Sequence, residues 1–169
     1  MRASKILPAL LLLLLWAGRP AMADESAFLQ SLVGTWSGKG TVIMRIGKPA
    51  INVNCSLNST AEAASVAMKG TCRGLLVVSR KISAELNAKG ASYSGIYVGP
   101  SGGRSALSGN RRGDSINLSV RWSKDVNGDR TARMMIQRVG ADGLRLRTVD
   151  RDLATGKSIA TSDILLRRS

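Results

Sequence analysis

The sequence predicts an all-β protein: a single antiparallel meander of about eight to ten strands that closes into a barrel, preceded by one short helix. Three observations support this fold. Apolar and polar residues alternate with a period of two, turn-forming residues separate these runs at short intervals, and only one segment after the first 23 residues has helical periodicity. Sheets of this size close into a barrel or stack as a sandwich, and strictly sequential hairpins favour the barrel.

The first 23 residues have the pattern of a secretory signal peptide. Arg2 and Lys5 precede the apolar run 6–16, and Ala21-Met22-Ala23 forms an A-x-A cleavage site. The run of about 11 residues is too short to span a bilayer, which takes roughly 20. We therefore expect residues 1–23 to be removed after Ala23. Residues 24–169 are expected to form a single β-barrel domain, periplasmic or secreted, without a transmembrane segment.

The elements follow in order from the cleavage site. Residues 26–33 predict a helix, because Phe28, Leu29 and Leu32 share one face and Ser26 can cap it. Beyond this helix the period drops to two, which is typical of half-buried antiparallel strands. The clearest alternating runs are residues 36–46, 51–58, 66–73, 76–86, 115–122 and 144–147.

The two cysteines predict a disulfide within one hairpin. An exported protein folds in an oxidising compartment, where paired cysteines are bridged. If the strands 51–59 and 65–74 turn near Glu62-Ala63, Cys55 lies opposite Cys72, both on the apolar face. The same register places Leu57 opposite Gly70. Two unpaired buried cysteines are the alternative.

The segment that joins the helix to the first strand resembles the entrance of a lipocalin or calycin barrel. Gly34-Thr35-Trp36 matches the family's G-x-W motif and follows the predicted helix, as in that family. The resemblance implies that the helix closes one end of the barrel and that Trp36 packs across its floor. It also implies that a basic residue near the last strand, Arg167 or Arg168, covers the tryptophan.

The composition argues against an enzyme. The chain has no histidine, which removes the usual general base and nearly all zinc sites. Bridged cysteines leave no thiol nucleophile. Asp150 and Asp152 share strand parity, but a turn follows them directly, so we interpret them as a solvated strand end. We expect a non-enzymatic protein without a cofactor or a metal.

Arg80 is the most suggestive candidate for ligand binding. It shares strand parity with Ile82 and Leu86, so a regular strand points it into the barrel, where it can hold a carboxylate. A bulge near Gly74 or an internal partner such as Asp163 are the alternatives. The candidate ligand-binding residues are Arg80, Trp36, Tyr93, Tyr97 and Arg104, with the glycine-rich loop 99–103 at the barrel mouth.

The charge of the chain predicts anionic partners. The formal net charge is +14, and most basic residues are arginine. Several arginines have outward parity on consecutive strands and form a candidate anion-binding face. Its residues are Arg121, Arg133, Arg145 and Arg147. Nucleic acid is disfavoured by the export signal and by an aromatic content of 4%.

The sequence therefore predicts an exported, non-enzymatic, lipocalin-like binding protein for a small amphipathic or anionic ligand. The alternative is a cell-envelope protein whose basic face docks on anionic polysaccharide or lipid, or inhibits a protease. The oligomeric state is left open by both.

Overall fold

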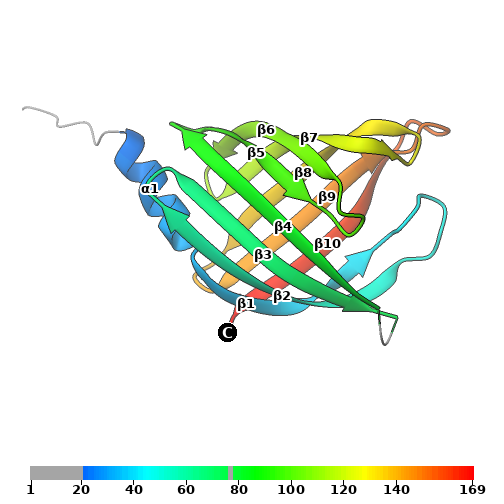
Figure 1. Cartoon of the computed structure of the whole chain (residues 1–169), viewed down its shortest axis with the longest axis horizontal. Helices are drawn as coiled ribbons and strands as arrows, with labels where there is room; N and C mark the ends of the chain where they lie inside the picture. The colour runs from blue at the N-terminus through cyan, green and yellow to red at the C-terminus, as the bar shows by residue number, and fades with distance from the viewer. Residues whose placement is uncertain (1–20, 76–77) are drawn as a thin grey trace, which may run out of the picture.

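The alternating runs curl into one closed antiparallel barrel with a helix at one end, as the computed structural model of residues 21–75 and 78–169 shows (Figure 1). Ten strands lie within these residues, at the upper limit of the expected number. The elements are α1 (Ala21–Ser31), β1 (Gly34–Val42), β2 (Ile51–Glu62), β3 (Ser65–Gly74), β4 (Val78–Lys89), β5 (Ser92–Val98), β6 (Arg104–Arg112), β7 (Ser115–Val126), β8 (Asp129–Val139), β9 (Gly143–Arg151) and β10 (Ser158–Arg168).

The topology is the predicted meander. Each strand pairs with its neighbours in sequence, and β1 pairs with β10 to close the barrel. Close approach at this seam requires glycine: a Cβ on Gly38 would lie 2.1 Å from the backbone oxygen of Leu165. The all-β fold with one short amino-terminal helix is confirmed.

The hairpin predicted from the cysteines has the expected register. Cys55 pairs with Cys72 across β2 and β3, and their sulfurs form a disulfide. Leu57 lies opposite Gly70, as the alternation requires. The prediction of a bridged pair is confirmed, and the alternative of two free thiols is wrong.

Several predicted element ends need correction. The helix spans Ala21–Ser31 and not residues 26–33. The first strand ends at Val42 and not at Ile46, because the chain leaves the sheet after Ile43 and turns back with a bond from the Lys48 amide to Arg45. The strands β2, β7 and β9 extend beyond their predicted runs. Polar residues such as Ser59, Lys124 and Asp150 occupy inward positions there, so the alternation of apolar and polar residues is lost before the strand ends. Residues 76–77 of the run 76–86 lie outside the described residues.

The core fills the half of the barrel next to α1. Phe28, Leu29 and Leu32 of the helix are buried against the barrel end. Apolar inward residues from the strands complete this core, and they include Trp36, Leu86, Ile116, Ile136, Leu144 and Leu166. No helix in the described part of the chain has the length and apolar character needed to cross a membrane.

Candidate functional site

The end of the barrel covered by α1, which we call the closed end, is sealed around Trp36. The indole N–H of Trp36 donates to the Leu32 carbonyl at 3.1 Å. Arg168 stacks on the other side of the ring at 4.3 Å and donates to the carbonyls of Ser31 and Val33. The structure therefore places a basic residue of the last strand over the tryptophan. These bonds also satisfy carbonyls at the carboxyl end of the helix.

A buried carboxylate ties the helix to the barrel at the same end. Glu25 is 4% exposed, accepts a hydrogen bond from the hydroxyl of Tyr93, and accepts two bonds of 3.0 Å from Arg111. Burial lowers the pKa of Arg111, but its bonds to Glu25 and Asp24 outweigh this effect and raise it. Burial, and then the bond to Glu25, raise the pKa of Tyr93 far above its usual range. Tyr93 therefore belongs to the seal of the closed end.

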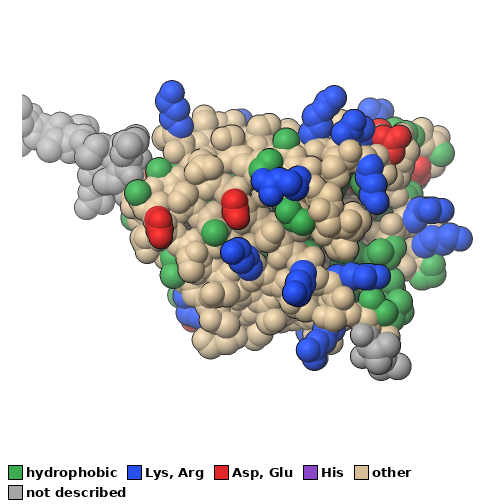
Figure 2. All heavy atoms as spheres, in the orientation of Figure 1, with side chains coloured by type: hydrophobic (Ala, Val, Ile, Leu, Met, Phe, Trp, Pro, Cys, Tyr) green, Lys and Arg blue, Asp and Glu red, His purple; other side chains and the backbone are tan. Residues whose placement is uncertain are grey.

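The opposite end, which we call the open end, contains a pocket of about 500 Å³ in the mouth of the barrel. Tyr97, Trp122 and Met44 supply apolar surface, and Arg80 and Lys124 supply positive charge. Figure 2 shows hydrophobic side chains gathered at the end away from α1, with Lys and Arg among them. The glycine-rich loop 99–103 forms one edge of the pocket. Its volume lies within the range of small-molecule sites, roughly 300–1,000 Å³.

Two aromatic side chains form the wall of this mouth pocket. The rings of Tyr97 and Trp122 meet edge to face with centroids 6.1 Å apart. The indole N–H of Trp122 is buried without a hydrogen-bond partner among the described residues. A buried donor left without a partner is costly, about 1–3 kcal/mol. The pocket therefore offers an incoming ligand an apolar aromatic wall.

Tyr97 also separates the mouth pocket from the barrel interior. A smaller cavity of about 70 Å³ lies deeper, between Met68, Ile82, Met134 and Leu146, and Tyr97 lines both spaces. Burial raises the pKa of Tyr97 to about 12, so the phenol is neutral at physiological pH. A Cβ on Gly99 would lie 2.9 Å from the Tyr97 ring, so the glycine leaves room for it. Tyr97 thus forms the floor of the mouth pocket.

Arg80 reaches the mouth through a regular strand. The pairing of β3 with β4 is unbroken from Ser65–Asn87 to Gly74–Val78, so no bulge reverses the direction of Arg80. Asp163 is not its partner, because Asp163 binds Arg145 at 2.6 and 2.7 Å on the outer wall. Both alternatives raised from the sequence are therefore wrong. Among the described residues, neither Arg80 nor Lys124 forms an ion pair.

A polar cluster beside the mouth fixes the long loop between β1 and β2. Asn127, at the turn between β7 and β8 with φ 55°, donates to Asp150 at 2.7 Å and accepts from the Ile46 amide at 2.9 Å. Asp150 is 3% exposed, so the prediction that it is a solvated strand end is wrong. Asp152 does stabilise the following turn, through bonds to Ala154 and Thr155.

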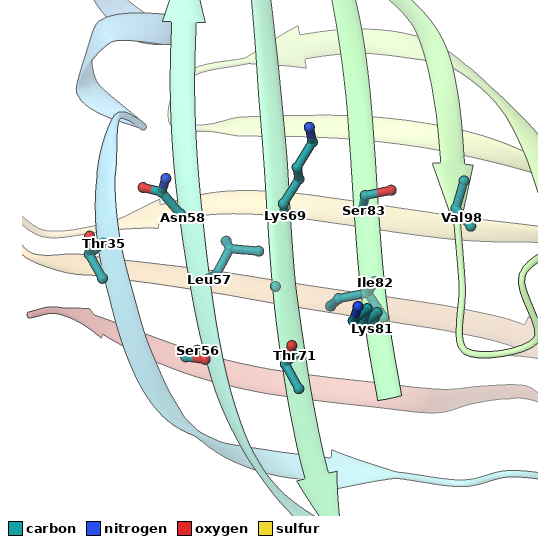
Figure 3. A pocket seen from close by; sticks show the side chains of 11 residues that line it. Thr35, Ser56, Leu57, Asn58, Lys69, Thr71, Lys81, Ile82, Ser83 and Val98 are labelled. Carbon is teal, nitrogen blue, oxygen red and sulfur yellow. The ribbon is translucent and has the colours of Figure 1, made fainter. Parts of the chain in front are cut away.

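The outer wall of the barrel carries two broad hollows on different strands. One, of about 530 Å³, lies over β2–β4 and contains Lys69 and Lys81 among Ser, Thr and Asn side chains (Figure 3). Gly70 lies between Leu57 and Ile82 on the neighbouring strands and has no side chain there. The other, of about 570 Å³, lies over β6–β9 and contains Arg121, Arg133 and Arg151.

The predicted site residues separate into three groups. Arg80 and Tyr97 line the mouth pocket. Trp36 and Tyr93 are buried at the closed end. Arg104 is exposed at the start of β6, beside the pocket but not among the residues that line it. The structure adds Trp122, which sequence reasoning missed although it has the same inward parity as Val120 and ends that apolar run.

The predicted anion-binding face also divides. Arg121 and Arg133 line one continuous hollow. Arg147 lines a smaller hollow beside it, which shares Arg133. Arg145 is bound to Asp163, which lowers the pKa of that carboxyl. Arg151, which follows on the same strand as Arg145 and Arg147 and belongs to the same predicted basic cluster, joins the hollow of Arg121 and Arg133.

Comparisons with known proteins support the fold. No family model matches the chain, and no curated protein matches its sequence. The crystal structure of Rv2717c from M. tuberculosis is similar with a TM-score of 0.66 at 15% identity, over 89% of this chain and 98% of that chain. The S-type phycobiliprotein lyase CPES from Guillardia theta has a TM-score of 0.48 at 13% identity, over 88% and 97% of the two chains. At 15% identity, the likeness to Rv2717c concerns the fold alone.

Proposed function

We propose that this protein is an exported, non-enzymatic binding protein that holds a small amphipathic anion in the open mouth of its barrel. The observation that carries the proposal is the mouth pocket of about 500 Å³, which is lined by the Tyr97–Trp122 pair together with Arg80 and Lys124. An apolar body packs against the aromatic pair, and an anionic head group lies at the two cations. The shared floor at Tyr97 limits the ligand to the mouth unless the ring moves.

Charge complementarity selects an anion over a cation or a neutral lipid. Among the described residues, the side chains that line the mouth pocket include two cations and no carboxylate. Arginine binds carboxylates and phosphates through paired N–H donors. Ser101 and Ser123 add hydroxyls to the lining of the pocket, and the buried Ser105 hydroxyl accepts a hydrogen bond from the Ser123 amide. A ligand with one anionic group and an apolar chain of moderate length uses all of these features.

Binding without catalysis agrees with the chemistry of the pocket. The chain has no histidine, and both cysteines are in the disulfide. In the part of the chain that the structure describes, no carboxylate lines the pocket beside its hydroxyls to act as a general base. Export is supported by the signal-like first 23 residues and by the disulfide, which is typical of oxidising compartments. The mass of the purified mature protein, which should begin at Asp24, tests this part.

Calorimetric titration with decanoate tests the binding proposal. Decyltrimethylammonium, which has the same chain and the opposite charge, is the ligand control. We expect decanoate to bind and Arg80→Gln to weaken it about tenfold, the effect of losing one charged hydrogen bond. Arg104→Gln removes the same charge just outside the pocket and should leave the affinity unchanged. Equal binding of both ligands, or equal loss in both variants, would contradict the proposal.

A further inference from the structure

The outer wall over β6–β9 has a feature that the mouth pocket does not use. Arg121, Arg133 and Arg151 line a hollow of about 570 Å³, and a second hollow of about 300 Å³ continues from Arg133 to Arg147. The two share Ser119, Arg133 and Val149, so together they form one elongated groove. We call it the arginine groove.

Strand pairing explains why these arginines gather. Arg121 lies opposite Thr131, and Arg133 lies between Ser119 and Val149, on neighbouring strands of the outer wall. The arginines are separated by small side chains such as Ser108, Ser119 and Thr131, which line the hollow between the guanidinium groups. One further contact is a bond of 3.3 Å from Arg133 to the hydroxyl of Ser158. The groove is therefore bordered by guanidinium groups and lined by hydroxyls.

Among the described residues, the carboxylates near the groove leave three of its four arginines without an ion pair, while Asp129 accepts hydrogen bonds from Thr131 and Asp163 pairs with Arg147. Asp150 is the acidic residue among those lining it, and its side chain is buried and bound to Asn127 and to the Arg151 amide. Asp163 lies beside the far end and is held by Arg145, with Arg147 at 3.6 Å. None of Arg121, Arg133 and Arg151 forms an ion pair within the described residues.

We propose that the arginine groove binds a linear acidic polysaccharide that carries carboxylate groups. Guanidinium groups bind carboxylates in a paired geometry, and the Ser and Thr hydroxyls bind sugar hydroxyls. No aromatic side chain of residues 21–75 and 78–169 lines the groove, so these residues do not provide the stacking surface that single-stranded nucleic acids use. Its elongated shape suits a chain better than a compact ion. This site is separate from the mouth pocket and does not depend on it.

The opposite wall provides a matched control. The hollow over β2–β4 has a similar volume, about 530 Å³, but carries Lys69 and Lys81 in place of arginines (Figure 3). Lysine is a hydrated point charge without the paired donors of arginine. A double substitution there removes the same charge from the same kind of surface. It therefore separates a specific groove from a general effect of net charge.

Binding to polygalacturonate, measured at two salt concentrations, tests the proposal, with neutral dextran as the polymer control. We expect binding to polygalacturonate that weakens with salt, and a loss of about tenfold or more in R121Q/R133Q. K69Q/K81Q should lose much less. Both variants should keep the unfolding midpoint and the decanoate affinity of the parent, because neither set of residues lies in the core or the mouth.

Three results would overturn the proposal. Equal losses in the two double variants would show that net charge alone attracts the polymer. Equal affinity for a single-stranded oligothymidylate would show a general polyanion surface. Absence of binding at low salt would show that the groove has no such ligand, while the decanoate result for the mouth would stand by itself.

Discussion

At the end of the barrel next to α1, the hairpins turn in two or three residues, whereas the connections at the other end run from two to eight residues. At the closed end, Trp36 donates to Leu32 and Glu25 binds Tyr93 and Arg111, while Ser59 Oγ and Arg138 Nε have no hydrogen-bond partner among the described residues. The open end leaves the Trp122 indole unpaired beside a pocket of about 500 Å³. The first end is filled by the helix and core side chains and stabilises the fold, and the second has the open cavity typical of a binding site.

The comparison predicts a large difference between the two tryptophans. Trp36→Ala removes a fully buried ring from the closed end and should lower the free energy of unfolding by about 3–5 kcal/mol. Trp122→Ala should lower it much less, since the ring lies in an open mouth. Urea unfolding followed by circular dichroism measures both. Similar losses in the two variants would contradict the assignment of stability to the closed end.

The ion pair at the closed end should have the next largest effect. Arg111→Ala leaves Glu25 buried without its cation, which should lower the free energy of unfolding by about 3 kcal/mol. The double variant E25Q/R111M removes both charges and should recover part of this loss. Urea unfolding of the two variants checks this, and a double variant less stable than R111A would argue that the pair itself is not the cause.

The disulfide should contribute to the free energy of unfolding by an amount similar to that of the ion pair. It should stabilise the fold without changing the affinity for the ligand. Cys55 and Cys72 close a loop of 17 residues in the chain, in register with Arg80 on β4. C55A/C72A should lower the free energy of unfolding by about 2–4 kcal/mol. The decanoate affinity of the folded variant should stay the same. A lost affinity in a fully folded variant would indicate that the bridge shapes the mouth.

The two tyrosines report on the two ends through their ionisation. Both have a raised pKa, so the neutral phenol is favoured in the folded state. The stability this contributes is full below the usual tyrosine pKa of about 10 and is lost as the pH rises toward the folded value. Tyr97, with a pKa of about 12, should ionise before Tyr93. Absorbance of phenolate in Y93F and Y97F distinguishes them, and the reverse order would contradict the burial described for the closed end.

Local patterns predicted the strands and their register well. Alternation places Cys55 opposite Cys72 without any knowledge of the rest of the barrel, because residues facing one side recur at every second position. The same parity gives the inward direction of Arg80 and of Trp122. The same parity places Asp150 on the inward face with Leu144 and Leu146. The sequence interpretation gave more weight to the turn that follows and therefore predicted a solvated residue.

Strand parity does not predict the position of a residue along the barrel axis. Parity gives the face of a strand but not the end of the barrel at which a residue lies, so Trp36 and Tyr93 were grouped with Tyr97. The contacts that define the closed end join residues far apart in the chain, such as Glu25 with Tyr93 and Arg111, and no local pattern records them. The arginine groove likewise depends on strands that become neighbours only when the barrel forms.

The most direct test of the ligand site compares the indole N–H signals of Trp36 and Trp122 in nitrogen-15 NMR spectra, assigned with W36F and W122F. Addition of decanoate should shift the Trp122 signal, because the Trp122 side chain lines the mouth pocket, and should leave the signal of Trp36, which is bonded to Leu32 at the closed end, unchanged. A shift of Trp36 alone, or of neither signal at saturating decanoate, would contradict a small-ligand site at the open end.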